Sequence, residues 1–532
     1  MKPNSLLLAG LLMAVGPVAP AAHRFDLATA TIADIQKAID HGALSSEKLV
    51  ELYLARIDAY DRKGPKINSV ITMNPKAIEE ARALDRERLE TGRRSPLHGI
   101  PVVIKDLIDM EGLPTTAGFT PFGSPIPERD AGVVARVKAA GGIILAKVAT
   151  VNWFGNDGFS TTHPIGATLN PYNALHQPGG SSNGTGAAIA AYFAAVGIGT
   201  DTGGSVQNPA AYCSLVGMVA SQGLSSRTGI VPRGPTHDRA GPMTRSVYDT
   251  AVLLAAMSGW DAEDLDTYQG IGHFPKFEWV SQLTRTNLVG LRIGVLREMV
   301  STAPEDAPAR VLFERAVEDL RKGGAQIVDP VLTGIDIRHQ SSGAVSSVAS
   351  YEMISSGDVY LSRLGPNRPY KTMAEFIAKV GPEKFSERYV NGLTLPPPDE
   401  TEDFHARFRA RKAVRDLIEG LIDRHDLDAF VLLYRSTPPL ANAPSGPAAP
   451  VVPSLNNLTS TTGLPGIIMP GGYTSDNLPV GIQFVGKMFD DLKLLRVAHA
   501  YEQVSRRRKT PESTPPLPGE SFEYNNLNLS RR

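Results

Sequence analysis

The chain has 532 residues, of which 42% are hydrophobic, so it is long enough to bury a sizeable core. Its 54 Lys and Arg residues balance 55 Asp and Glu, and a formal net charge of −1 gives no general electrostatic reason to bind nucleic acid or an acidic membrane. The single cysteine, Cys213, excludes an intramolecular disulfide and argues against a thiolate metal cluster.

The amino terminus has the pattern of a secretory signal peptide. Lys2 precedes an apolar run that starts at Leu6, and Ala19-Pro20-Ala21 supplies a small-residue cleavage pattern. We therefore expect residues 1–22 to be a signal peptide and the mature protein to be periplasmic or secreted. An uncleaved membrane anchor is the alternative. No later segment predicts a membrane span.

Helical patterns follow the expected signal peptide. Thr31 is placed to cap a helix that starts at Ile32, and Leu49 and Tyr53 recur at helical spacing. Asn74 followed by Pro75 predicts the start of another helix, which Gly92 can end.

The pattern then changes to strand, helix, strand. Residues 98–109 (HGIPVVIKDLID) predict a strand that ends near Lys105. Residues 130–140 predict a helix closed by Gly141, and the next run, GIILAKV, predicts a second strand. This order indicates an α/β fold. Asp106 and Asp109, just after the first strand, are expected to be solvated charges.

The remaining chain alternates between apolar and polar stretches. Residues 184–195 predict a tightly packed core helix, and the polar stretch 260–430 predicts a helical insertion over the sheet. Strand character returns at 428–433 and 478–486, before an amphipathic helix near 492–504. Residues 506–532 are polar and proline-rich, and we expect a disordered tail.

The glycine-rich segment HQPGGSSNGTG, residues 176–186, has three interpretations. A phosphate-binding P-loop fails because no lysine follows the final glycine. A nucleophile elbow centred on Ser182 fits G-x-S-x-G, and His499 could complete the triad of an α/β-hydrolase esterase. The third interpretation is a turn in which Ser181 or Ser182 caps the following helix.

Three motifs together carry a family resemblance. HGIPVVIKD at 98–106, PGGSSNGTGAA at 178–188 and GTDTGGSVQNPA at 199–210 resemble the core of the amidase signature family, and GPMTRSVYDTA at 241–251 extends the match. The resemblance implies one large domain over 23–505, built on a large mixed β-sheet flanked by helices. It also implies a cofactor-free amidase that acts on a small-molecule amide.

Carried over by position, the resemblance implies a catalytic set of two serines and a lysine. Ser205 would be the nucleophile, Ser181 a bridging serine in a cis peptide, and Lys105 the base. The backbone N–H groups of an oxyanion hole would come from Thr202, Gly203, Gly204 and Ser205. The residue types fit, since a serine needs a neighbour to take its proton and a lysine can do so only when burial keeps it neutral.

This chain departs from the family pattern at several positions. Gln207 stands where the family commonly has arginine, so Asp201 is expected to lack its usual partner. Asn183 replaces a usual glycine, and Val219-Ala220-Ser221 replaces a common Lys-Pro-Thr. None of these departures removes a member of the Ser-Ser-Lys set.

The motifs support an exported amidase that converts a carboxamide or anilide to an acid and ammonia or amine. A non-catalytic amide-binding relative or assembly subunit is the alternative. Loops around 115–125, 150–165 and 340–400 are expected to select the substrate, and four aromatic residues suggest an apolar acyl pocket: Trp153, Phe154, Phe159 and Tyr351. The scattered histidines show no metal-ligand spacing, so no metal is expected, and the sequence does not specify an oligomeric state.

Overall fold

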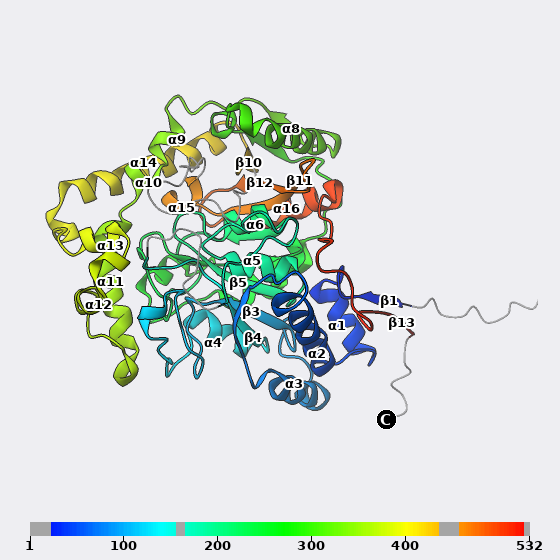
Figure 1. The fold of residues 1–532 in the computed structure, drawn as a ribbon. Helices are drawn as coiled ribbons and strands as arrows, with labels where there is room; N and C mark the ends of the chain where they lie inside the picture. Colours follow the sequence, from blue (N-terminus) through cyan, green and yellow to red (C-terminus); the bar gives the residue numbers. More distant parts are fainter. Residues whose placement is uncertain (1–22, 156–164, 436–456, 526–532) are drawn as a thin grey trace, which may run out of the picture.

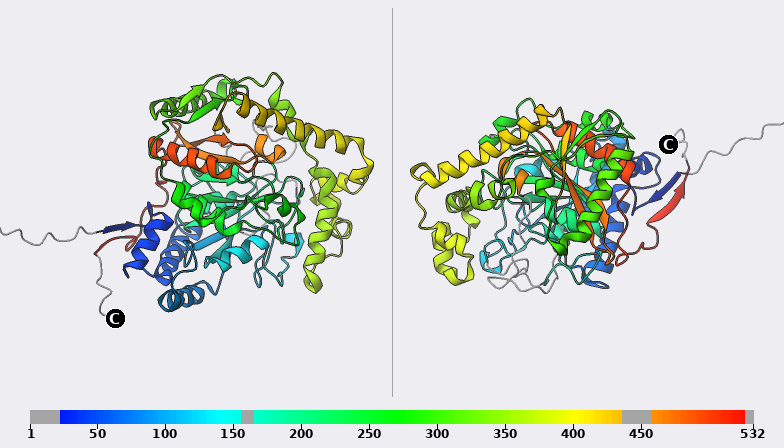
Figure 2. Two further views of the ribbon diagram at one scale, coloured as in Figure 1. Left: turned by 180° about the vertical axis from the view of Figure 1, so that it is seen from behind. Right: turned by 90° about the horizontal axis from the view of Figure 1, so that it is seen from above.

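The computed structural model describes residues 23–155, 165–435 and 457–525. They form a single α/β domain around one large sheet, with helices packed on both faces (Figures 1 and 2). In this part of the chain no helix is both long and apolar enough to cross a membrane. The predicted signal peptide, residues 1–22, lies outside the described residues.

The large sheet has eleven strands in mixed orientation. β3 runs parallel to β4 and β5, whereas β5 and β7 are antiparallel. In spatial order the strands are β2 (Val70–Met73), β4 (Ile143–Val148), β3 (Pro101–Lys105), β5 (Val196–Asp201), β7 (Arg239–Thr244), β6 (Val216–Val219), β11 (Gly466–Tyr473), β12 (Pro479–Val485), β10 (Ala429–Leu433), β8 (Arg292–Val295) and β9 (Gln326–Val328).

The helices begin and end close to where the sequence predicts. Thr31 caps α1 in a capping box with Asp34, and Gly92 ends α3. The helices are α1 (Ile32–Asp40), α2 (Ser46–Ile57), α3 (Ala77–Thr91), α4 (Gly132–Ala139), α5 (Asn183–Ala190), α6 (Gln207–Tyr212), α7 (Val247–Met257), α8 (Ala307–Lys322), α9 (Ile337–Gln340), α10 (Gly343–Ser346), α11 (Ala349–Arg363), α12 (Met373–Val380), α13 (Glu387–Gly392), α14 (Glu402–Arg424), α15 (Leu458–Thr462) and α16 (Asp491–Ser505).

Alternating side chains of the strands fill separate cores on the two faces of the sheet. In β10, Val431 and Leu433 join the core that contains α8 and α16 residues, whereas Phe430 and Leu432 join the core that contains α14 residues. A strand with period-two side chains that is covered on both faces is apolar throughout. This explains the uninterrupted apolar run in the sequence there.

The expectation of a purely helical insertion over 260–430 is wrong in part. Residues 292–295 and 326–328 form β8 and β9, which extend one edge of the large sheet. Both strands are short, and β9 is only partly buried, so its sequence lacks the apolar run that predicts a strand. Helices α11 to α13 do form a separate group beside the sheet (Figure 1).

The expectation of a disordered tail is wrong for residues 506–525. Strand β13 (Ser521–Tyr524) pairs antiparallel with β1 (His23–Asp26), beside α1 (Figure 1). Arg56 of α2 is buried and bonds Glu520 at 2.8 Å. A buried guanidinium needs acceptors, and the polar composition of this segment supplies them.

Candidate active site

Lys105 is the last residue of β3, near the centre of one half of the sheet. Its side chain is fully buried, and its Nζ donates to Ser181 Oγ at 2.6 Å and to Thr200 Oγ1 at 2.9 Å. Thr200 is close because β5 runs parallel beside β3. The Trp153 ring, with its centroid 5.2 Å from Nζ, lies beside the amine.

Burial lowers the pKa of Lys105 well below its ordinary value. Asp201 and Asp238 act in the opposite direction, and Arg233 reinforces the lowering. No carboxylate of the described residues lies within ion-pair distance of Nζ, since its close partners are two hydroxyl groups. These surroundings therefore disfavour the charged ammonium relative to the neutral amine, which is the form that can accept a proton.

Ser181 lies in a bend two residues before α5. The Gly180–Ser181 peptide bond is cis, and the Ser181 carbonyl accepts from Val151 N at 3.2 Å. Ser182 N donates to the carbonyl of Ser205 at 3.2 Å. This backbone bond joins the segment that carries Ser181 to the loop that carries Ser205, so the structure brings the three predicted residues into one region.

The loop 202–206 is organised by Asp201, at the end of β5. One carboxylate oxygen of Asp201 accepts from Gly204 N and the other from Val206 N, both at 2.9 Å. Gly204 was expected to donate to an oxyanion, and the structure contradicts this assignment because its N–H is bound to Asp201. The N–H groups of the other three expected donors, Thr202, Gly203 and Ser205, make no hydrogen bond among the described residues.

As the Gln207 departure predicts, no arginine of the described residues pairs with Asp201, and neutral donors bind it instead. Ser460 Oγ donates to Asp201 at 2.7 Å, and Gln207 Nε2 donates at 3.2 Å. Gln207 is itself buried and accepts from Thr459 Oγ1 at 2.8 Å. Neutral donors therefore surround the carboxylate at this position of the loop.

The structure rules out a nucleophile elbow at Ser182. An elbow follows a buried strand, whereas no strand directly precedes Ser182, which stands at the N-cap position of α5. Its buried hydroxyl bonds the backbone of Thr200. His499 lies on α16, where it contacts Gln503, on the helix that packs against α7 and α8.

Asp106 and Asp109 are not solvated, contrary to expectation. Asp106 forms a buried ion pair with Lys147 of β4 at 3.1 Å. Asp109 accepts from Thr115 Oγ1 at 2.8 Å and from Tyr360 Oη at 2.9 Å, and burial raises its pKa to about 6. The chain after β3 folds back over the sheet, and this return buries both carboxyl groups.

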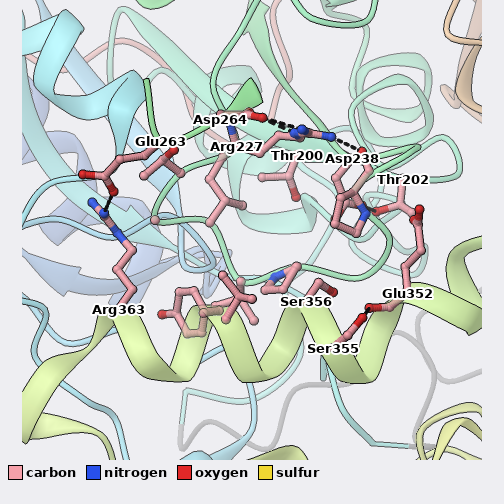
Figure 3. A pocket seen from close by; sticks show the side chains of 18 of the residues that line it. Thr200, Thr202, Arg227, Asp238, Glu263, Asp264, Glu352, Ser355, Ser356 and Arg363 are labelled. Atoms are coloured by element: carbon pink, nitrogen blue, oxygen red, sulfur yellow. Dashed lines mark hydrogen bonds and ion pairs between the residues drawn. The ribbon is translucent and has the colours of Figure 1, made fainter. Parts of the chain in front are cut away.

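A cavity of about 740 Å³ adjoins these groups (Figure 3). Thr200, Thr202 and Trp153 line it next to Lys105, and α11 forms the opposite wall with Glu352 and Tyr360 among others. The expected loops at 150–165 and 340–400 therefore contribute to this cavity. The expected loop at 115–125 does not line the cavity. Residues from 227–239 and 263–264 line it instead, and the sequence had not indicated them.

The four candidate pocket aromatics have different surroundings. Trp153 lines the cavity. Phe154 packs in an aromatic cluster with Phe122 and Phe376. Tyr351 is absent from the cavity wall and bonds Asp403. Phe159 lies outside the described residues.

Sequence reasoning missed Thr200 and Asp238. Thr200 lies inside the same GTDTGGS segment as Ser205, and its position at the end of a strand parallel to that of Lys105 is the signal that could have identified it. Asp238 accepts from the Thr202 hydroxyl. No local pattern marks Asp238 as part of this site, because its link to the GTDTGGS segment is made by Thr202, 36 residues away. In the described part of the chain, no cluster of three His, Cys, Asp or Glu residues could hold a metal.

Comparisons with known proteins identify the family of the chain. The family model described as Amidase matches residues 48–495. A probable amidase of Arabidopsis thaliana is 32% identical over 530 residues, which is 95% of this chain and 96% of that protein. One of the subunits of the glutamyl-tRNA(Gln) amidotransferase of Acinetobacter baumannii (strain AYE) is 32% identical, over 90% of this chain and 96% of its own.

The solved structures give the same result for the fold. The native peptide amidase from Stenotrophomonas maltophilia has a TM-score of 0.81 and 32% identity, over 92% of this chain and 99% of that one. An amidase family protein from Bacillus anthracis str. Ames has a TM-score of 0.78 and 31% identity, over 91% and 92%.

Proposed function

This chain belongs to the amidase signature family and is a hydrolase of amides, and we propose that it cleaves a carboxamide or anilide through an acyl-enzyme on Ser205. The products are a carboxylic acid and ammonia or an amine. One observation carries the proposal: a buried lysine without a carboxylate partner contacts the Ser181 hydroxyl at 2.6 Å.

The first half of the reaction forms the acyl-enzyme. Ser205 Oγ attacks the amide carbon while its proton passes to Ser181 Oγ, and Ser181 passes its own proton to the neutral Nζ of Lys105. The tetrahedral intermediate then collapses, the carbon–nitrogen bond breaks, and the proton returns through Ser181 to the leaving amine. A relay of this kind suits a base that burial holds neutral.

The second half uses water. The same relay takes a proton from the attacking water and returns it to Ser205 Oγ as the acyl–oxygen bond breaks, which releases the acid. The unbonded N–H groups of Thr202, Gly203 and Ser205 are the donors that we assign to the developing oxyanion. Asp201 supports them by fixing the loop through Gly204 and Val206.

A serine-directed fluorophosphonate probe, followed by mass-spectrometric mapping, tests the nucleophile. We expect covalent labelling of Ser205, complete loss of labelling in Ser205→Ala, and retention in Ser356→Ala, which removes a hydroxyl group of the cavity wall. Labelling at any other serine would refute Ser205 as the nucleophile. No labelling of the folded wild-type chain would favour a non-catalytic, amide-binding role.

We also propose that the enzyme is exported. The support is the sequence alone: Lys2, the apolar run from Leu6 and the Ala19-Pro20-Ala21 pattern. Expression of the full chain in a bacterium, fractionation, and amino-terminal sequencing of the product test this. A chain that stays in the cytoplasm with residues 1–22 intact would contradict export.

A further inference from the structure

Two carboxylates at one end of the cavity have only neutral hydrogen-bond donors. Asp238 accepts from Arg233 N at 2.8 Å, from Gly234 N at 3.0 Å and from the Thr202 hydroxyl. Glu352 accepts from Thr236 N at 3.0 Å and from the hydroxyl of the same threonine. Neither forms an ion pair within the described residues.

The other end of the cavity differs, because its charges neutralise one another. Glu263 bonds both Arg129, at 2.8 Å, and Arg363. Arg227 lies between the two ends, where it bonds Asp264 through Nε at 2.9 Å and also donates to the Pro235 carbonyl. Figure 3 shows Glu263 with Arg363 at one end of the cavity and Glu352 with Asp238 at the other.

No arginine of the described residues forms an ion pair with these carboxylates, although the charge of Arg227 acts on both from a greater distance and Arg411 donates to the Thr236 carbonyl at 3.2 Å. Arg239 lines the cavity, but its guanidinium donates to backbone carbonyls, including those of Ala220 at 2.8 Å and Thr459 at 2.7 Å. The guanidinium of Arg233 lies over the Trp153 ring at 4.2 Å and donates to the Trp153 carbonyl at 2.6 Å. The Arg233 side chain is not part of the cavity wall.

Desolvation makes this arrangement costly without a cation. Burial raises the pKa of both Glu352 and Asp238 above their ordinary values. A positive group in the cavity would offset that cost and form charge-assisted hydrogen bonds. The two carboxylates are therefore an electrostatic match for a ligand cation.

The position of this acidic end connects it to the reaction. Asp238 bonds Thr202, which is three residues before Ser205, and Thr200 on the same wall contacts Lys105. A primary amide releases only ammonia, so a cation that such a substrate carries must lie in its acyl part. We propose that the preferred substrates are amides with a cationic acyl group, whose ammonium or guanidinium binds Glu352 beside Asp238. This inference rests on the proposed function.

A matched pair of ligands tests the preference. Nα-acetyl-lysinamide carries an ammonium group on a flexible stem, and 2-acetamidoheptanamide replaces that ammonium with a methyl group. Calorimetric titration of the full-length Ser205→Ala chain measures binding without turnover. We expect the cationic ligand to bind tighter by roughly tenfold, the effect of one charge-assisted hydrogen bond. Equal or weaker binding of the cationic ligand would overturn the proposal.

Two glutamates provide matched variants in the Ser205→Ala background. Glu352→Gln keeps the shape but removes the charge, and we expect the ratio of the two binding constants to fall to about one. Glu263→Gln removes a cavity carboxylate that already has two arginine partners, and the ratio is expected to remain. A ratio that Glu352→Gln leaves intact would contradict the assignment of Glu352.

Turnover separates this inference from the proposed function. If the wild-type chain hydrolyses both amides with the expected ratio of kcat/KM, both proposals are supported. If Ser205→Ala prefers the cationic ligand but the wild-type chain hydrolyses neither amide, the cation site stands and the catalytic proposal fails. Hydrolysis of both amides at equal kcat/KM refutes the cation site alone.

Discussion

Lys105 and Lys147 lie on the neighbouring strands β3 and β4, and both are fully buried. Lys147 is 3.1 Å from the carboxylate of Asp106, whereas Lys105 contacts only the hydroxyl groups of Ser181 and Thr200. A carboxylate within ion-pair distance offsets the desolvation cost of a buried ammonium, whereas a buried ammonium without one tends to lose its proton. The comparison shows that the partner, rather than burial alone, separates a structural lysine from a candidate base.

Removing Lys105 should give the largest effect on activity. We expect Lys105→Met to lower kcat/KM by roughly 10²–10⁴-fold, the usual contribution of a general acid–base group. Because burial lowers the pKa of Lys105, the unfolded chain binds the extra proton below about pH 10.4, and this opposes folding. The variant should therefore unfold at the same or a higher temperature at neutral pH, as calorimetry can measure. Near-normal turnover would exclude Lys105 as the base.

Removing Lys147 should lower the stability of the fold and leave the reactivity of Ser205 in place. Lys147→Met leaves Asp106 buried without a cation, and we expect it to lower the free energy of unfolding by about 3–5 kcal/mol. Urea denaturation measures this loss, and the double variant with Asp106→Asn should recover most of it. Fluorophosphonate labelling of the folded fraction should persist. A loss below about 1 kcal/mol would mean that the pair contributes no more than a surface ion pair.

Thr200→Val should give the smallest and most specific effect. In the wild-type enzyme, kcat/KM is expected to rise with pH as Lys105 loses its proton. The Thr200 hydroxyl accepts from the Lys105 ammonium, so its loss should lower the pKa of Lys105 further. The acidic limb of the pH profile should then move to lower pH by roughly one unit. Ser356→Ala is the control and should leave the acidic limb of the pH profile unchanged. An unchanged acidic limb in Thr200→Val would show that Thr200 does not act on Lys105.

Much of the candidate site was predictable because its members lie in short motifs. Ser205 and Thr202 share one glycine-rich segment, and Lys105 ends an apolar strand, as the sequence indicated. The assignment of Gly204 failed because sequence position does not reveal that its N–H is bound to Asp201. Asp238 and Glu352 were missed because Thr202, which binds Asp238, and Thr236, which binds Glu352, come from distant parts of the chain, as does the opposite cavity wall.

Local patterns determined the α/β class, the strand ending at Lys105 and the capped helices, because spacing and capping act within a few residues. Only the tertiary structure decided which buried lysine has a carboxylate partner. Asp106, just after β3, contacts Lys147 on the neighbouring strand β4, whereas Lys105 contacts Ser181, which is 76 residues away in the sequence. The tertiary structure also decided that β13 pairs with β1 and that Arg56 meets Glu520. Pairing, burial and therefore pKa depend on neighbours that the linear order does not specify.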